Sequence, residues 1–146
     1  MKTFPRSAFR IPHSIEPLEA RIAPAAVVQL SDLDGANGFD ISGVAAGDKS
    51  GFSVSGAGDI NGDGIDDVII GAHRADTNGS DSGASYVVFG SSTPFAASLN
   101  LSGLTGANGF KISGVAAGDY SGRSVSGAGD INGDGIDDLT IGAWYA

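Results

Sequence analysis

The chain has 146 residues, of which 17 are acidic and 8 basic, and its formal net charge is −9. So acidic a chain repels phosphate backbones, which argues against nucleic acid as a partner, and no run of eighteen apolar residues is present to span a membrane. Cysteine is absent, which excludes disulfide, zinc–thiolate and thiol chemistry.

Residues 1–23 form a basic leader that differs from the rest of the chain. The leader carries four basic and two acidic side chains, so the remainder carries a net charge of −11. It has no apolar run of seven or more residues and is therefore a poor Sec signal peptide. We expect a disordered segment or an export and targeting segment here.

Two copies of one unit follow the leader. A shift of 71 residues aligns residues 35–72 with 106–143, and only five of the 38 aligned pairs differ. The first copy covers residues 24–94 and the second, which is shorter, covers 95–146. The differing pairs are Asp40/Lys111, Lys49/Tyr120, Phe52/Arg123, Val68/Leu139 and Ile69/Thr140.

Each copy reads as short strands joined by glycine-rich turns. Helical periodicity is nowhere sustained, and Val, Ile, Ser and aromatic residues fill the runs between glycines. About four antiparallel strands per unit indicate an all-β fold. A four-stranded unit that stacks on its neighbours is typical of a propeller blade. The expected strands of the first copy lie within residues 38–43, 52–58, 67–72 and 84–90.

Alternation predicts which side chains of these strands are buried. Val68 and Ile70 should face inward, and Ile69 should face the less buried side because the second copy has Thr140 there. Trp144 and Tyr145 are expected to pack in a core or between blades. The Phe52/Arg123 pair has no explanation in the sequence.

The segment GDINGDGIDD occurs at residues 58–67 and again at 129–138. Side-chain oxygens at positions 1, 3, 5 and 9 of the loop, glycine at position 6 and a carbonyl at position 7 are the layout of a calcium loop. All these donors are hard oxygens, which favours calcium over transition metals. The candidate ligands are Asp59, Asn61, Asp63, Ile65 and Asp67, and in the second loop Asp130, Asn132, Asp134, Ile136 and Asp138.

Two other interpretations of the loops remain open. Asn-Gly and Asp-Gly are strong hairpin signals, so a plain turn would account for residues 61–64 without metal. It would not account for the flanking Asp59 and Asp67. A helix–loop–helix calcium module of the dockerin kind would need a helix after each loop and an acidic residue at position 12, where this chain has Ile70 and Ile141.

The stretch SGFSVSGAGDINGDGIDDVIIGAH, residues 50–73, resembles the FG-GAP repeat of integrin α propellers and of large bacterial secreted proteins. The calcium loop matches the family pattern fully in both copies. The family's Phe is replaced by Ser50 or Ser121, and its Pro by His73 or Trp144.

This resemblance implies a β-propeller, usually of seven blades, with calcium bound by the ten loop residues named above. It also implies a non-catalytic module for adhesion or extracellular recognition, with a protein or polysaccharide ligand. Since 146 residues hold fewer than two such units, we expect an incomplete propeller of one complete and one truncated blade. Further blades would come from a longer parent chain or from self-association.

The leader carries a second, shorter resemblance. IEPLEARIAPAA, residues 15–26, is similar to the Leu-Glu-Pro-Arg segment of very large bacterial surface proteins, with Ala20 in place of the family's Pro. Together the two resemblances imply an extracellular or cell-surface location in a bacterium. A remaining alternative is that the repeats are an accessory domain of a larger secreted enzyme.

Overall fold

The computed structural model describes residues 29–146, and the expected leader at 1–23 lies outside the described residues. Within them the fold is all-β, as predicted, and the only helical segments are two single 3-10 turns. No helix of residues 29–146 has the length and apolar character needed to cross a membrane. The elements are η2 (Leu30–Asp32), β1 (Asp40–Ser42), β2 (Ser53–Gly58), β3 (Asp67–Ala72), β4 (Ala84–Val88), β5 (Ser98–Asn100), η3 (Leu101–Gly103), β6 (Gly109–Ser113), β7 (Ser121–Gly129) and β8 (Asp138–Ala143).

The central sheet is antiparallel, with strand order β2-β3-β4-β6. Three of its strands come from the first copy of the repeat, and β6 comes from the second copy. The repeat boundary at residues 94/95 therefore lies inside one sheet. Strands β7 and β8 repeat the β2–β3 hairpin, and β1 pairs with β5 in parallel.

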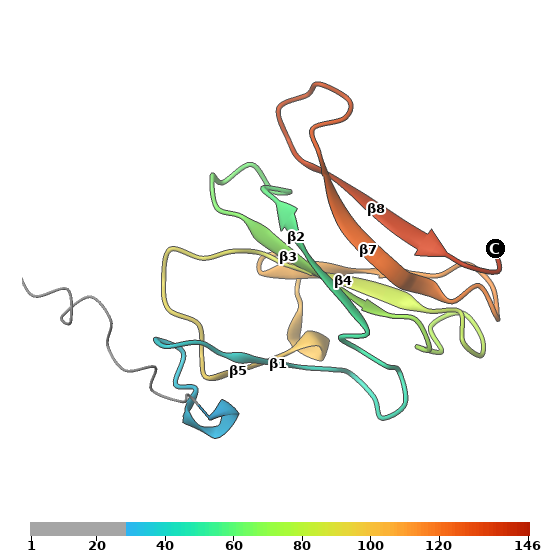
Figure 1. The fold of residues 1–146 in the computed structure, drawn as a ribbon, viewed down its shortest axis with the longest axis horizontal. Coiled ribbons are helices and arrows are strands. Elements are labelled where there is room, and N and C mark those ends of the chain that lie inside the picture. Colours follow the sequence, from blue (N-terminus) through green and yellow to red (C-terminus); the bar gives the residue numbers. More distant parts are fainter. Residues whose placement is uncertain (1–28) are drawn as a thin grey trace, which may run out of the picture.

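Packing on both faces of the central sheet explains its apolar sequence (Figure 1). Ile41 of β1 and Leu99 of β5 pack against the face that carries Ile70 and Tyr86. The β7–β8 hairpin packs against the opposite face. Strands β3 and β4 are therefore buried on both sides and read as nearly continuous apolar runs. This arrangement is that of an incomplete propeller, with one four-stranded blade and a two-stranded neighbour.

The expected burial is correct on one face of β3 and wrong on the other. Val68 and Ile70 pack in one cluster, as predicted. Ile69, which was expected to be the less buried residue, is 0 % exposed. Its side chain joins Val87 in a cluster that Val125, Leu139 and Ile141 of the second copy complete. The neighbouring hairpin, which alternation within one strand cannot reveal, buries it.

Close backbone approach between the two hairpins depends on glycine. A Cβ atom on Gly71 would collide with the carbonyl oxygen of Gly122, and the Ser53 hydroxyl donates to that same oxygen at 2.9 Å. A side chain at position 71 would push β7 away from β3 and open the interface that covers Ile69.

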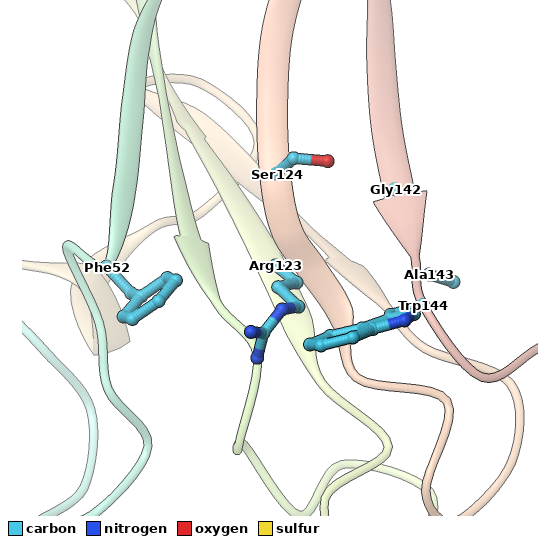
Figure 2. A pocket seen from close by; sticks show the side chains of 6 residues that line it. All are labelled: Phe52, Arg123, Ser124, Gly142, Ala143 and Trp144. Carbon is cyan, nitrogen blue, oxygen red and sulfur yellow. The ribbon is translucent and has the colours of Figure 1, made fainter.

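The C-terminal aromatic residues depart from expectation. Trp144 is 58 % exposed and Tyr145 is 68 % exposed, so neither packs in the core of the described residues; packing between blades stays a prediction. Trp144 follows β8 directly and stacks on Tyr145 with ring centroids 5.4 Å apart. Both rings therefore lie at the surface of the described residues, where Trp144 also contacts Arg123 (Figure 2) and Tyr145 also contacts Tyr120.

Candidate metal loops

Each acidic loop joins the two strands of a hairpin. The first lies between β2 and β3 and the second between β7 and β8. Strands follow both loops, so the helix–loop–helix interpretation is wrong for the described residues. Gly64 and Gly135, at position 6, have φ angles of 84° and 89°, which glycine adopts without the strain of a side chain.

Position 1 organises the first loop. One carboxylate oxygen of Asp59 accepts N–H bonds from Gly62 at 2.7 Å and Asp63 at 3.0 Å, and the other accepts from Gly64 at 2.7 Å. The N–H of Gly64, followed by those of Gly62 and Asp63, holds the pKa of Asp59 below its usual value. This carboxylate is therefore ionised, and the loop wraps around it.

The second loop repeats this arrangement. Asp130 accepts from Gly133 at 2.6 Å, from Asp134 at 3.1 Å and from Gly135 at 2.8 Å. The same backbone donors, with Gly135 first, lower the pKa of Asp130. Because each loop makes these bonds within itself, its conformation is a local property of the sequence.

Positions 3, 5 and 7 form a chain of local hydrogen bonds. The Asn61 side-chain oxygen accepts from the N–H of Asp63 at 2.9 Å, and the Asp63 carboxylate accepts from Ile65 at 2.9 Å. The Asn61 amide also donates to Asp63 at 3.0 Å. In the second loop Asn132, Asp134 and Ile136 make the same backbone bonds, each at 2.9 Å.

Position 9 differs most between the loops. Asp67 is 1 % exposed and accepts from the N–H groups of Ile60 at 2.9 Å and Gly90 at 2.7 Å. Gly90 follows β4, so this carboxylate fastens the loop to the next strand of its own sheet. Asp138 keeps the first of these bonds, from the equivalent N–H of Ile131 at 3.0 Å. Its other oxygen accepts from the Asn132 amide at 3.4 Å and not from a neighbouring strand.

The donor set fits a hard divalent cation. Each loop supplies three carboxylates and one amide oxygen, and no Lys or Arg forms an ion pair with them within residues 29–146. No three His, Cys, Asp or Glu side chains in this part of the chain lie close enough to ligate one ion as they stand. The carboxylate oxygens point instead to the backbone N–H groups described above.

One link between the loops could not be read from the sequence. The N–H of Asp59 donates to the carboxylate of Asp137 at 2.8 Å, and the N–H of Asp137 donates to the carbonyl of Asp59 at 3.2 Å. A Cβ on Gly58 would collide with the same carboxylate. Asp137 is therefore the residue that joins one loop to the other across the blade interface.

Comparison with known proteins shows which repeat family the first loop and its strands resemble. Residues 50–88, which contain β2, the first loop, β3 and β4, match the FG-GAP repeat family. The chain is 37 % identical over 98 residues to integrin alpha pat-2 of Caenorhabditis elegans, covering 66 % of this chain and 7 % of that protein. It is 32 % identical over 127 residues to integrin alpha-2 of Bos taurus, covering 77 % of this chain and 8 % of that protein.

The chain therefore spans less than a tenth of the length of these relatives. The matched segment includes the complete first loop and the strands that hold it. The second copy repeats that segment through β8, residues 121–143, with three differences in 23 positions. We conclude that this chain carries FG-GAP repeats of the integrin α type.

Proposed function

We propose that the chain is a non-catalytic, calcium-stabilised recognition module of an extracellular or cell-surface protein. The observation that carries the proposal is the concentration of unpaired carboxylates in two loops with the same local hydrogen bonds. Asp67 in particular is buried, and only neutral N–H groups bond to it. A buried carboxylate without a cationic partner is unfavourable, and a bound cation would remove that penalty.

Each of the five candidate residues of a loop would contribute an oxygen ligand to the ion. Asp59, Asn61, Asp63 and Asp67 would bind by side chain and Ile65 by its carbonyl, as would their five counterparts in the second loop. Calcium would supply the positive charge that these oxygens lack. Asp67 would connect the occupied loop to the end of β4, and Asp137 would connect the two loops. Ion binding would therefore stiffen the strands and their interface together.

The similarity to integrin α chains supports a role in adhesion or recognition. The module would present a surface for an extracellular protein or polysaccharide, and further blades would complete the propeller in a longer chain. Extracellular calcium modules bind with dissociation constants of about 10⁻⁴ to 10⁻³ M, so such loops would fill outside a cell.

Thermal unfolding with and without calcium tests the proposal. At 10 mM calcium, which is roughly 10 to 100 times that dissociation constant, each occupied site adds about 1.4 to 2.7 kcal/mol to the free energy of unfolding. We expect the melting temperature to rise by several degrees over the value in EDTA, with a smaller rise in magnesium.

A variant with both Asp59→Asn and Asp130→Asn should lose the calcium-dependent rise. Asp40→Asn is the matched control, because Asp40 is an exposed carboxylate of β1 outside both loops. Equal melting temperatures in calcium and EDTA for the unaltered protein would refute calcium stabilisation and favour the plain-turn interpretation.

A further inference from the structure

The two acidic loops make unequal contacts, although their ten residues are identical. Position 8 of the second loop, Asp137, is partly buried, whereas position 8 of the first loop, Asp66, is exposed. Within residues 29–146, no N–H group donates to the Asp66 carboxylate, while the N–H of Asp59 donates to that of Asp137. Packing of the two hairpins therefore gives Asp137 a contact that its counterpart lacks in this part of the chain.

A single residue holds the backbone of Asp59 on both sides. The Asp59 N–H donates to the Asp137 carboxylate at 2.8 Å, and the Asp59 carbonyl accepts from the Asp137 N–H at 3.2 Å. Asp59 is position 1 of the first loop, and its own carboxylate accepts the N–H groups of residues 62–64. The contact therefore reaches the residue around which the first loop is organised.

Neighbouring glycines bring the loops close at the same point. A Cβ on Gly58 would collide with Asp137, whereas nothing lies within 4 Å of a Cβ on its counterpart Gly129. A Cβ on Gly62 would lie 3.5 Å from the Ile136 side chain. Positions 7 and 8 of the second loop thus pack against the start of the first loop, and glycine makes this close approach possible.

Asp137 lies between two of the residues that would bind calcium in the second loop. Ile136 on one side would offer its carbonyl, and Asp138 on the other its carboxylate. An ion held by both neighbours restricts the backbone between them, and with it the groups that hold Asp59. Because ordering a loop opposes ion binding, the first loop binds more tightly once its position 1 is already fixed. Linkage makes the effect reciprocal, so each loop strengthens the other equally.

We propose that the two loops bind calcium cooperatively, and that Asp137 is the positioning residue that couples them. This inference rests on the proposed function, because it concerns the same two sites. Calcium in the second loop fixes Asp137, which holds Asp59 in the arrangement that the first loop needs. In a chain with further blades, Asp66 would make the same contact with the loop of a preceding unit, and the coupling would run from loop to loop.

Charge repulsion between the two ions opposes this coupling. Each loop holds four carboxylates, counting position 8, so it stays negative with one divalent ion bound. At 0.15 M salt, charges in solvent are screened beyond about 8 Å. Coupling between sites changes affinity by about 5- to 150-fold. Since only the second of two binding steps gains, the half-saturating calcium concentration falls by the square root of that factor, about 2- to 12-fold.

A calcium titration at 0.15 M salt, followed by amide NMR, measures each loop separately. The N–H groups of Gly64 and Gly135 donate to the position 1 carboxylates, so their signals report the first and second loops respectively. The comparison chain carries Asp130→Asn and Asp134→Asn. These changes neutralise two carboxylates of the second loop, the same charge that one Ca²⁺ ion supplies, and its Gly135 signal should no longer respond. We expect its first loop to need at least about twice as much calcium for half-saturation as that of the unaltered chain.

Asp137→Ala should abolish this difference, because it removes the carboxylate that holds Asp59. The matched control is Asp66→Ala, which removes a carboxylate from the same position of the other loop and should retain the difference. Each variant is measured with and without the two asparagine substitutions. This double-mutant cycle separates the coupling from any change in the first loop's own affinity.

Failure of this inference and failure of the proposed function give different results. If neither loop's signal responds to calcium, the proposed function is refuted and the inference with it. If both respond, equal half-saturation of the first loop in the unaltered and double-asparagine chains would overturn the coupling alone. A difference that Asp137→Ala leaves unchanged would overturn the role of Asp137. The comparison of the unaltered and double-asparagine chains needs no change at Asp137, so it tests the coupling even if Asp137→Ala does not fold.

Discussion

Two single substitutions, at positions 69 and 140, test whether β7 and β8 cover β3 at the blade interface. Ile69→Thr places in the first copy the residue that the second copy already carries. Ile69 is 0 % exposed and packs against Val125, Leu139 and Ile141 across the interface. The change removes about two buried carbon groups, worth about 0.8 kcal/mol each, and adds a buried hydroxyl that costs about 1 to 3 kcal/mol more.

The expected loss is therefore about 2.6 to 4.6 kcal/mol in the free energy of unfolding. In a domain of this size each kcal/mol lowers the melting temperature by about 4 °C, so a fall of roughly 10 to 18 °C should be seen. The assay is urea unfolding followed by circular dichroism, with a thermal scan beside it. The Thr140 hydroxyl is exposed and donates to the Ser126 carbonyl at 3.3 Å.

The reverse change, Thr140→Ile, is the matched control and should alter stability by no more than about 0.5 kcal/mol, as surface changes do. Equal effects at positions 69 and 140 would show that β7 and β8 do not cover β3. A loss below about 0.5 kcal/mol for Ile69→Thr would lead to the same conclusion.

The contact between Asp59 and Asp137 and the burial of His73 can each be tested by substitution. Gly58→Ala should destabilise more than Gly129→Ala, because both positions have positive φ, 72° and 67°, but only at position 58 would the new Cβ meet Asp137. Urea midpoints measure the difference, and equal losses would contradict the link. Burial, then the charge of Arg123, lowers the pKa of His73 from its ordinary 6.5. A lowered folded-state pKa means that stability is complete above pH 6.5 and falls as pH drops below it, since the unfolded chain takes up the proton first. The melting temperature should fall from pH 7.5 to 5.5, and in His73→Phe this fall should disappear; a fall that persists in the variant would assign it to another group.

The sharp turn of each loop could be predicted because it depends on one glycine, and the hydrogen bonds around it are local. The carboxylate of Asp59 bonds only to residues three to five positions later in the chain, and the sharp turn needs only Gly64. Spacing in the sequence therefore determines this geometry. The role of Asp137 could not be predicted, because its partner is 78 residues away in the chain and is brought near by the packing of two hairpins.

Blade organisation was only partly predictable for the same reason. The repeat period showed how many strands one unit supplies. It could not show that β6 of the second copy completes the sheet of the first. The repeat period is the same whether a strand pairs within its own copy or with the neighbouring copy. The Phe52/Arg123 difference was visible in the sequence and had no explanation there. The structure supplies one, since the two side chains meet through the ring face of Phe52.

By itself, the sequence determined the all-β fold class, the repeat and the sharp turns at Gly64 and Gly135, because all three depend on near neighbours in the chain. Only the tertiary structure decided that Ile69 is buried while Thr140 is exposed, and that Trp144 lies at the surface beside Arg123. The physical reason is that equivalent residues of two nearly identical copies have different neighbours. The hairpin of the second copy covers the first, and no described strand covers the outer face of the second.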